Sequence, residues 1–183
     1  MEIKNNSQIE VDLVFKLSER IPYLIKNKTD IDIEIFDNQF WEKVFLCWLR
    51  IIIDEKKSYF QKIISNKKSF SLSFEIVSDC EIANLNQKWL NKKGPTDVLS
   101  FPMIFEKNSL DEIIFIELGD LFVSLDTAFT QSLEYNHPLK REFLWLVSHG
   151  FLHLLGWDHK NQKELDNMLN FQEYLISRIN LDY

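Results

Sequence analysis

The chain has 183 residues with 45% hydrophobic and 27% charged side chains, which is typical of a globular protein with a sizeable core. No apolar run is long enough to cross a bilayer, and the polar N-terminus lacks the apolar core of a signal peptide. The net charge of −7 argues against a general nucleic-acid binder, because phosphate contacts need lysine and arginine. Cys47 and Cys80 are the two cysteines and are expected to be free thiols in a reducing cytoplasm. We therefore expect one cytoplasmic domain over residues 1–183, without membrane contact.

Strand and helix patterns alternate in the first part of the chain. Residues 9–13 and 31–35 each alternate apolar and polar side chains, which predicts two short strands. No element is predicted over residues 14–28, where Pro22 interrupts the pattern. Apolar side chains recur at helical spacing over residues 39–55, which predicts an amphipathic helix.

The middle of the chain predicts a second strand–helix unit. Residues 72–76 alternate again, and Asp79 is a plausible N-cap for a helix that ends near Asn91. After a break at Gly94-Pro95, a short strand is expected over residues 98–101. Residues 113–124 are also rich in strand-forming side chains, and Gly119 within them suggests a bulge or a close backbone approach.

The last third of the chain is predicted to be helical. One helix is expected over residues 125–135, a second begins with Pro138 as its first residue, and a third covers residues 162–179. The order of elements predicts an α+β fold, with a small mixed β-sheet flanked by helices.

Three of the four histidines follow one another closely, in the spacing H-x3-H-x2-G-x2-H. His149 and His153 are four residues apart, so they share one face of the predicted helix. Gly156 stands where a helix end favours a residue with positive φ, and the chain can then return His159 to the same point. Three neutral imidazoles with one open position are a ligand set of catalytic zinc sites. The sequence therefore predicts a zincin-like metal helix that holds one zinc ion.

The spacing is similar to that of the metzincin zinc peptidases, with one change. Those enzymes carry a glutamate after the first histidine as the general base, whereas this chain has Gly150. Peptide hydrolysis by that route is therefore not expected. A metal could still lower the pKa of a bound water or act as a Lewis acid. We interpret Gly150 as leaving room beside the metal for a bulky substrate such as a nucleic-acid backbone.

Other polar residues near these motifs admit two roles each. Asp97 either caps a turn or lies near the metal, and Asp120 either orients a histidine ring or is an exposed turn acid. Asp158 is expected to fix the histidine loop or to support a ligand, and His137 to be a loop or cap residue. Trp157 is expected to pack under the loop rather than to stack on a base.

The charge along the chain is uneven. Residues 61–95 carry six lysines against three acidic residues, which gives the segment a net charge of +3. This segment is either a local basic face that binds RNA or a solvated lysine surface.

Further motifs accompany the histidines in the second half of the chain. They are Leu85-Asn86, Pro95-Thr96-Asp97-Val98-Leu99-Ser100-Phe101-Pro102 and Gly119-Asp120-Leu121-Phe122-Val123-Ser124. Together with the histidine motif, they closely resemble the YbeY family of bacterial rRNA maturation factors over about residues 70–160. Residues 31–70 share only the rough strand–helix pattern, and residues 1–28 show no matching motif.

This resemblance implies a single-strand-specific endoribonuclease that binds zinc through His149, His153 and His159. It implies a role in maturation of the 3′ end of 16S rRNA and in ribosome quality control. The partners would be single-stranded rRNA and the ribosome or small-subunit proteins. The family fold is a small mixed sheet flanked by helices.

The chain departs from the family pattern at one position. The family often has an aromatic residue and a catalytic arginine shortly after the Leu-Asn pair, where this chain has Trp89 and Leu90. Leucine cannot hold a phosphate through a fork of donors. The candidates to replace the arginine are Lys92, Lys93 and Arg141, and the sequence does not choose among them.

Three functions compete. A metal-dependent endoribonuclease is the leading hypothesis, with attack by water or by the RNA 2′-hydroxyl. A zinc peptidase is disfavoured by Gly150. A non-catalytic ribosome assembly factor with a structural zinc site is the alternative that Leu90 keeps open, although structural sites normally have a fourth protein ligand.

Overall fold

The computed structural model describes residues 9–26, 32–55, 69–103 and 115–179. A four-stranded sheet in the order β1-β2-β4-β3 forms its centre. The strands are β1 (Glu10–Leu17), β2 (Ser69–Val77), β3 (Val98–Pro102) and β4 (Phe115–Ser124). β1, β2 and β4 are parallel, whereas β3 pairs with β4 in the antiparallel direction. The sheet is therefore mixed, and β3 forms one of its edges.

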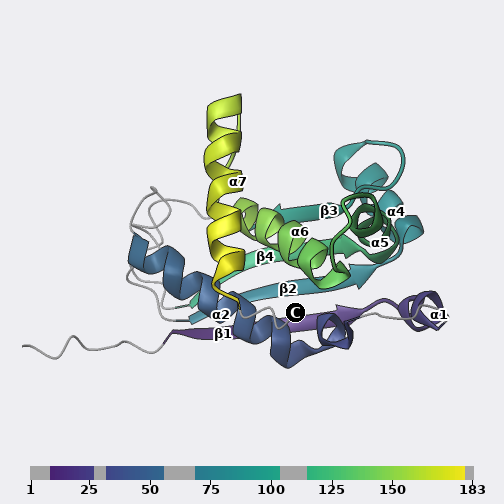
Figure 1. Cartoon of the computed structure of the whole chain (residues 1–183), viewed down its shortest axis with the longest axis horizontal. Coiled ribbons are helices and arrows are strands. Elements are labelled where there is room, and N and C mark those ends of the chain that lie inside the picture. Colours follow the sequence, from purple (N-terminus) through teal and green to yellow (C-terminus); the bar gives the residue numbers. More distant parts are fainter. Residues whose placement is uncertain (1–8, 27–31, 56–68, 104–114, 180–183) are drawn as a thin grey trace, which may run out of the picture.

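Helices connect β1 to β2 and β2 to β3, and further helices follow β4 (Figure 1). They are α1 (Ile21–Ile25), the 3-10 helix η1 (Ile33–Phe36), α2 (Asn38–Glu55), α4 (Asp79–Leu90), α5 (Leu125–Glu134), α6 (Leu139–Leu154) and α7 (Gln162–Ser177). Helix α2 packs on β1, α6 packs on β3 and β4, and α7 lies across α6. The expected α+β fold with a small mixed sheet flanked by helices is confirmed. No helix in the described ranges combines the length and apolarity needed to cross a membrane.

The core lies between the sheet and the α2–α6 layer. Alternate β2 side chains are buried against the helices, which explains the period of two in the sequence. Large aromatic side chains fill this layer, with Trp41, Phe45 and Trp48 from α2 and Phe143 and Phe151 from α6 all buried. Phe45 and Phe151 lie 5.1 Å apart between ring centroids. These phenylalanines are core residues and are not available to stack on bases.

The strand predicted over residues 31–35 is wrong. Residue 31 lies outside the described residues, and Ile33–Phe36 forms the 3-10 helix η1. Ile33 is 80% exposed while Ile35 is fully buried, so the alternating isoleucines do not share one buried face. The backbone is instead satisfied locally, because the Asp37 N–H donates to the Glu34 carbonyl at 3.0 Å. The Trp41 indole N–H donates to the Ile35 carbonyl at 2.8 Å, which anchors the segment to α2.

The cap of α4 also differs from the prediction by one residue. Ser78 is the N-cap, and its hydroxyl and the Glu81 carboxylate form a reciprocal capping box. The Asp79 carboxylate instead accepts hydrogen bonds from the hydroxyls of Ser124 and Thr127. Ser124 is the N-cap of α5. Asp79 therefore ties the beginnings of α4 and α5 together.

The remaining elements lie close to their predicted positions. The strand at residues 9–13 extends to Leu17, and the predicted helices correspond to α2, α5 and α7 with ends shifted by a few residues. Pro138 is the N-cap of α6 rather than its first residue. The close approach expected at Gly119 is confirmed, because a Cβ there would lie 2.1 Å from the Phe101 carbonyl oxygen.

The Glu81 cap generates a prediction about stability and pH. Burial raises the pKa of Glu81, but hydrogen bonds from Ser78 and Ser18 outweigh it, and the pKa lies below its ordinary value. A carboxylate with a lowered pKa stabilises the fold above its unfolded-state pKa, and this contribution is lost as pH falls through the folded-state pKa. Glu81→Gln is expected to cost about 1 kcal/mol at neutral pH, and the difference from the native chain should shrink on acidification.

Urea unfolding at several pH values measures this effect. Glu134→Gln, an exposed position on α5, is the matched control and should leave stability within a few tenths of a kcal/mol. A Glu81→Gln penalty that stays constant as the pH falls would show that the carboxylate charge plays no part.

Candidate metal centre

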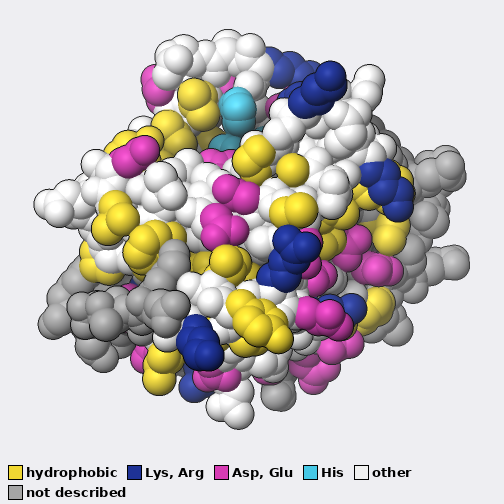
Figure 2. All heavy atoms as spheres, turned by 90° about the vertical axis from the view of Figure 1, so that its right-hand side faces the viewer, with side chains coloured by type: hydrophobic (Ala, Val, Ile, Leu, Met, Phe, Trp, Pro, Cys, Tyr) yellow, Lys and Arg dark blue, Asp and Glu magenta, His cyan; other side chains and the backbone are white. Residues whose placement is uncertain are grey.

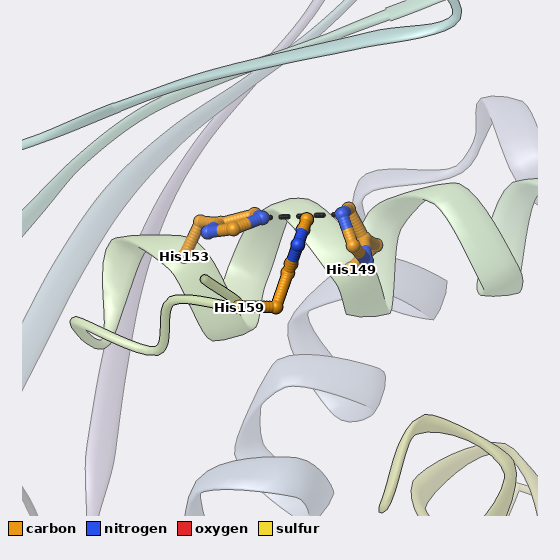
Figure 3. A group of neighbouring side chains, drawn as sticks. All are labelled: His149, His153 and His159. Carbon is orange, nitrogen blue, oxygen red and sulfur yellow. Dashed lines mark hydrogen bonds between the residues drawn. The ribbon is translucent and has the colours of Figure 1, made fainter. Parts of the chain in front are cut away.

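His149, His153 and His159 come together at the C-terminal end of α6 (Figure 3). One ring nitrogen from each residue lies within 4.8 Å of the others, and the Nε2 atoms of His149 and His153 are 3.1 Å apart. The first two side chains project from consecutive turns of α6, and the third reaches them from the following loop. The convergence predicted from the spacing is confirmed.

A tight turn after α6 returns the chain to the histidines. The Trp157 N–H donates to the Leu152 carbonyl at 3.0 Å and the Gly156 N–H donates to the His153 carbonyl at 2.9 Å, the two bonds of a Schellman motif. Gly156 has a φ of 78°, a left-handed conformation that favours glycine over residues with a Cβ. The Asp158 carboxylate then accepts from the His159 N–H at 2.8 Å. Asp158 is therefore the loop-fixing residue that we expected.

The same turn holds the ring of His153. Its Nδ1 atom lies 2.8 Å from the Trp157 carbonyl oxygen, which can only accept a hydrogen bond. Nδ1 therefore carries the proton, and Nε2 presents a lone pair toward the other histidines. Burial lowers the pKa of His153, and the neighbouring His149 lowers it further. Both effects favour the neutral form of the ring, which is the form that binds a metal ion.

The donor set fits a metal ion of the zinc type. Nitrogen ligands about 2.0–2.1 Å from a tetrahedral zinc are roughly 3.3 Å from one another, which is close to the 3.1 Å that separates the two Nε2 atoms. Three histidines form the only such cluster among the residues searched in the described ranges. The cluster could therefore hold one ion and leave a fourth position open, although the residues alone do not choose among zinc, nickel and copper.

A pocket opens beside the histidines. It has a volume of about 350 Å³ and is lined by Asp97, Val98, Ser100, Trp145, Leu146, His149, Gly150, His153 and Leu169. Figure 2 shows histidine side chains in a recess near the top of that view, with lysine and arginine side chains scattered among acidic ones. The pocket gives a substrate access to His149 and His153. The described residues visible in this view form no continuous basic band.

Gly150 lines the pocket beside the histidines, and it also has a packing role that the sequence did not indicate. A Cβ at this position would lie 2.3 Å from Leu121 Cδ1 and 3.0 Å from Val98 Cγ2, so the missing side chain faces the sheet. Glycine here lets α6 approach β3 and β4 closely. A side chain here would therefore require the Leu121 and Val98 side chains to shift, and the glutamate that acts as general base in metzincin-type peptidases is absent.

This contact generates a prediction. Alanine normally stabilises a helix over glycine by about 1 kcal/mol, but Gly150→Ala is expected to destabilise the protein by about 1–3 kcal/mol because it overpacks the helix–sheet interface. Chemical denaturation measures the change. The same substitution in a Leu121→Ala background, which removes the nearest atom, should cost less. A stabilised Gly150→Ala protein would contradict the steric explanation.

The structure also places the other polar and aromatic candidates from the sequence analysis. Asp97 combines both expected roles, because it lines the pocket while accepting hydrogen bonds from the Val98 N–H and the Gln131 amide. Asp120 is exposed on β4, so its assignment as an acceptor for a histidine ring finds no support.

His137 lies in the loop before α6, as expected. Its Nε2 atom is 2.5 Å from the buried carboxylate of Glu142. Trp157 packs on α7, since its ring stacks on Phe171 at 5.1 Å.

The candidates to replace the family arginine differ in their surroundings. Arg141 forms an ion pair with Glu173 at 2.9 Å, which holds its guanidinium against α7. Leu90 is 46% exposed, and Lys92 and Lys93 are exposed in the loop between α4 and β3. None of these four residues lines the histidine pocket. The catalytic assignment therefore stays a prediction, with the two lysines less constrained than the arginine.

Sequence reasoning missed one residue of the site. The side chain of Gln172 on α7 is fully buried, and its Oε1 atom lies 2.9 Å from Nδ1 of His149. The only sequence signal is a polar residue in the apolar stripe of an amphipathic helix, where a buried amide needs polar partners. The sequence does not show which residue that partner is.

Three imidazoles converge on a helix and the turn after it, beside an open pocket. This arrangement places the chain in the class of proteins with a candidate three-histidine metal centre. Comparison with known proteins identifies the family. Residues 24–180 match the family model described as Endoribonuclease YbeY. The chain belongs to the YbeY endoribonuclease family, whose members are hydrolases.

Two relatives with similar sequences agree with this assignment. Endoribonuclease YbeY of Prochlorococcus marinus subsp. pastoris is 56% identical over 178 residues, which cover 96% of this chain and 98% of the relative. The protein of the same name from Synechococcus sp. strain CC9605 is 41% identical over 143 residues, which cover 78% of this chain and 86% of the relative. The solution structure of TM1509 from Thermotoga maritima is 21% identical, with a TM-score of 0.45 and coverage of 91% and 90%. The sequence similarity thus extends over nearly the whole chain.

Proposed function

We propose that this protein is a metal-dependent, single-strand-specific endoribonuclease in which His149, His153 and His159 bind one zinc ion. The observation that carries the proposal is the convergence of three ring nitrogens within 4.8 Å beside an open pocket. A zinc ion bound there would supply a Lewis acid and a water of lowered pKa. The neutral imidazole of His153 supports this function because a protonated ring could not act as a ligand.

The segment at the end of α4 supports an RNA substrate. Lys88, Lys92 and Lys93 are exposed, and Trp89 is 60% exposed with the Lys88 ammonium 5.0 Å from its ring centroid. Exposed cations and an aromatic face are the groups that bind phosphates and unstacked bases of single strands. The segment connects to β3 through a loop that contains the pocket residue Asp97. We propose that the RNA backbone is held along residues 88–93.

The biological role follows from the family resemblance. We propose that the protein acts in the cytoplasm, in 16S rRNA 3′-end maturation and ribosome quality control, and that its partners are the ribosome or small-subunit proteins. We further propose that residues 1–183 form a single domain. The match of the family model to residues 24–180 supports this assignment.

One alternative retains a specific observation in its favour. Leu90 replaces the arginine of the family pattern, which is compatible with a ribosome assembly factor whose zinc ion is structural. Structural zinc sites normally have four protein ligands, whereas the cluster found among the described residues has three. This difference favours the catalytic function.

Cleavage of a labelled single-stranded rRNA 3′-end fragment tests the proposal. The native protein with bound metal should cut the fragment, and His153→Ala should lose at least about 100-fold of the activity because a ligand is removed. A 2′,3′-cyclic phosphate on the product would indicate attack by the 2′-hydroxyl, and a 5′-phosphate attack by water. Equal cleavage by both proteins would indicate a contaminating nuclease. No cleavage by a metal-loaded protein that still binds ribosomes would favour the assembly factor.

The basic segment has its own test. Lys92→Ala/Lys93→Ala should weaken binding of single-stranded RNA and reduce the slope of log affinity against log salt by roughly 1.4, because each phosphate contact contributes about 0.7. Metal affinity should not change. Lys26→Ala/Lys43→Ala, which removes two exposed lysines elsewhere, is the charge-matched control. Equal losses in the two double variants would show that only net charge matters.

A further inference from the structure

We propose that Gln172 is a positioning residue that commits His149 to the tautomer with its lone pair on Nε2, and thereby prepares the cluster for a metal ion. The inference rests on the proposed metal site and does not depend on ribonuclease activity. The side chain of Gln172 reaches the site from α7, whereas two of the three histidines are on α6. Helix α7 would therefore take part in metal binding without contributing a ligand.

The orientation of the Gln172 amide is determined by its neighbours. Its Nε2 atom lies 3.1 Å from the Trp145 carbonyl oxygen, which can only accept, so the NH₂ group must be on this side. The same atom is 3.3 Å from Ser148 Oγ. The Ser148 hydroxyl donates to the Trp145 carbonyl at 2.9 Å, which leaves the serine oxygen free to accept from Gln172. The Oε1 atom consequently faces His149.

This orientation determines the position of the proton on His149. Oε1 of Gln172 is only an acceptor and lies 2.9 Å from Nδ1 of His149, so Nδ1 carries the proton of the neutral ring. The lone pair is then on Nε2, which lies 3.1 Å from Nε2 of His153. His153 also presents a lone pair on that atom, because its Nδ1 donates to the Trp157 carbonyl.

Two lone pairs therefore face each other across 3.1 Å. Without a proton or a cation between them, this contact is repulsive and cannot be a hydrogen bond. If Gln172 were absent, His149 could shift its proton to Nε2 and donate it to His153, and the pair would satisfy itself without metal. Gln172 removes this alternative, which lowers the cost of metal binding.

The two rings differ in what holds them. His153 is held by a backbone carbonyl, which no substitution of Trp157 removes, whereas His149 is held by a side chain. A single amide supplies both the acceptor for His149 and the donor for Trp145. Replacement of Gln172 therefore tests the tautomer of one ligand while the turn that holds the other stays intact.

Three variants separate positioning from packing. Gln172→Leu removes the acceptor, and its zinc affinity, measured by competition with a chromophoric chelator, should fall about 10–100-fold. Gln172→Glu keeps an acceptor for His149 but loses the donor to Trp145, so its zinc affinity should stay close to native even if its melting temperature falls. Ser148→Ala removes a different hydrogen bond of Gln172 and should keep native affinity. Equal losses of affinity in Gln172→Leu and Gln172→Glu would overturn the proposal, because both would then act through packing.

The tautomer itself can be measured without metal or RNA. In the metal-free native protein at neutral pH, ¹⁵N NMR of the imidazole nitrogens should show His149 protonated on Nδ1, and Gln172→Leu should move the proton toward Nε2. A native His149 protonated on Nε2 would refute the proposal even if Gln172→Leu fails to fold. Because neither measurement uses RNA, loss of the proposed ribonuclease function would leave both results interpretable.

Discussion

Helix α6 lies directly on the sheet because residue 150 has no side chain. The contact with Leu121 and Val98 sets the height of α6 above β3 and β4, and with it the position of both helical histidines over the pocket. The residue after the first histidine therefore carries no acidic side chain. Any proton transfer at this site must therefore come from elsewhere, such as a pocket group, a bound water or the substrate.

The histidine cluster depends on backbone geometry as much as on its ligands. The turn at Gly156 both returns His159 and brings the Trp157 carbonyl to His153. The Trp157 ring then stacks on Phe171 of α7, the helix that carries Gln172 to His149. This short loop thus orients the imidazole of His153 and packs on the second half of α7, which holds the imidazole of His149.

The exposed lysines of the α4–β3 segment lie apart from the lining of the histidine pocket. The pocket itself contains a carboxylate from Asp97. The protein as a whole is acidic, with a net charge of −7, so nonspecific attraction to nucleic acid is weak. The proposed single-stranded RNA substrate would therefore be held by local contacts with exposed lysines rather than by the overall charge.

The sequence by itself determined the features that depend on short-range spacing. The period of two in β2, the helical period of α2 and the H-x3-H-x2-G-x2-H motif each reflect local geometry, and the structure confirms them. Only the tertiary structure decided the conformation of Ile33–Phe36, the reason for Gly150 and the partner of His149. Each of these depends on a contact with a residue distant in sequence or on the burial of one side chain rather than its neighbour. Such contacts leave no periodic signal, because a buried Gln172 or a glycine against Leu121 is defined by the element packed opposite it.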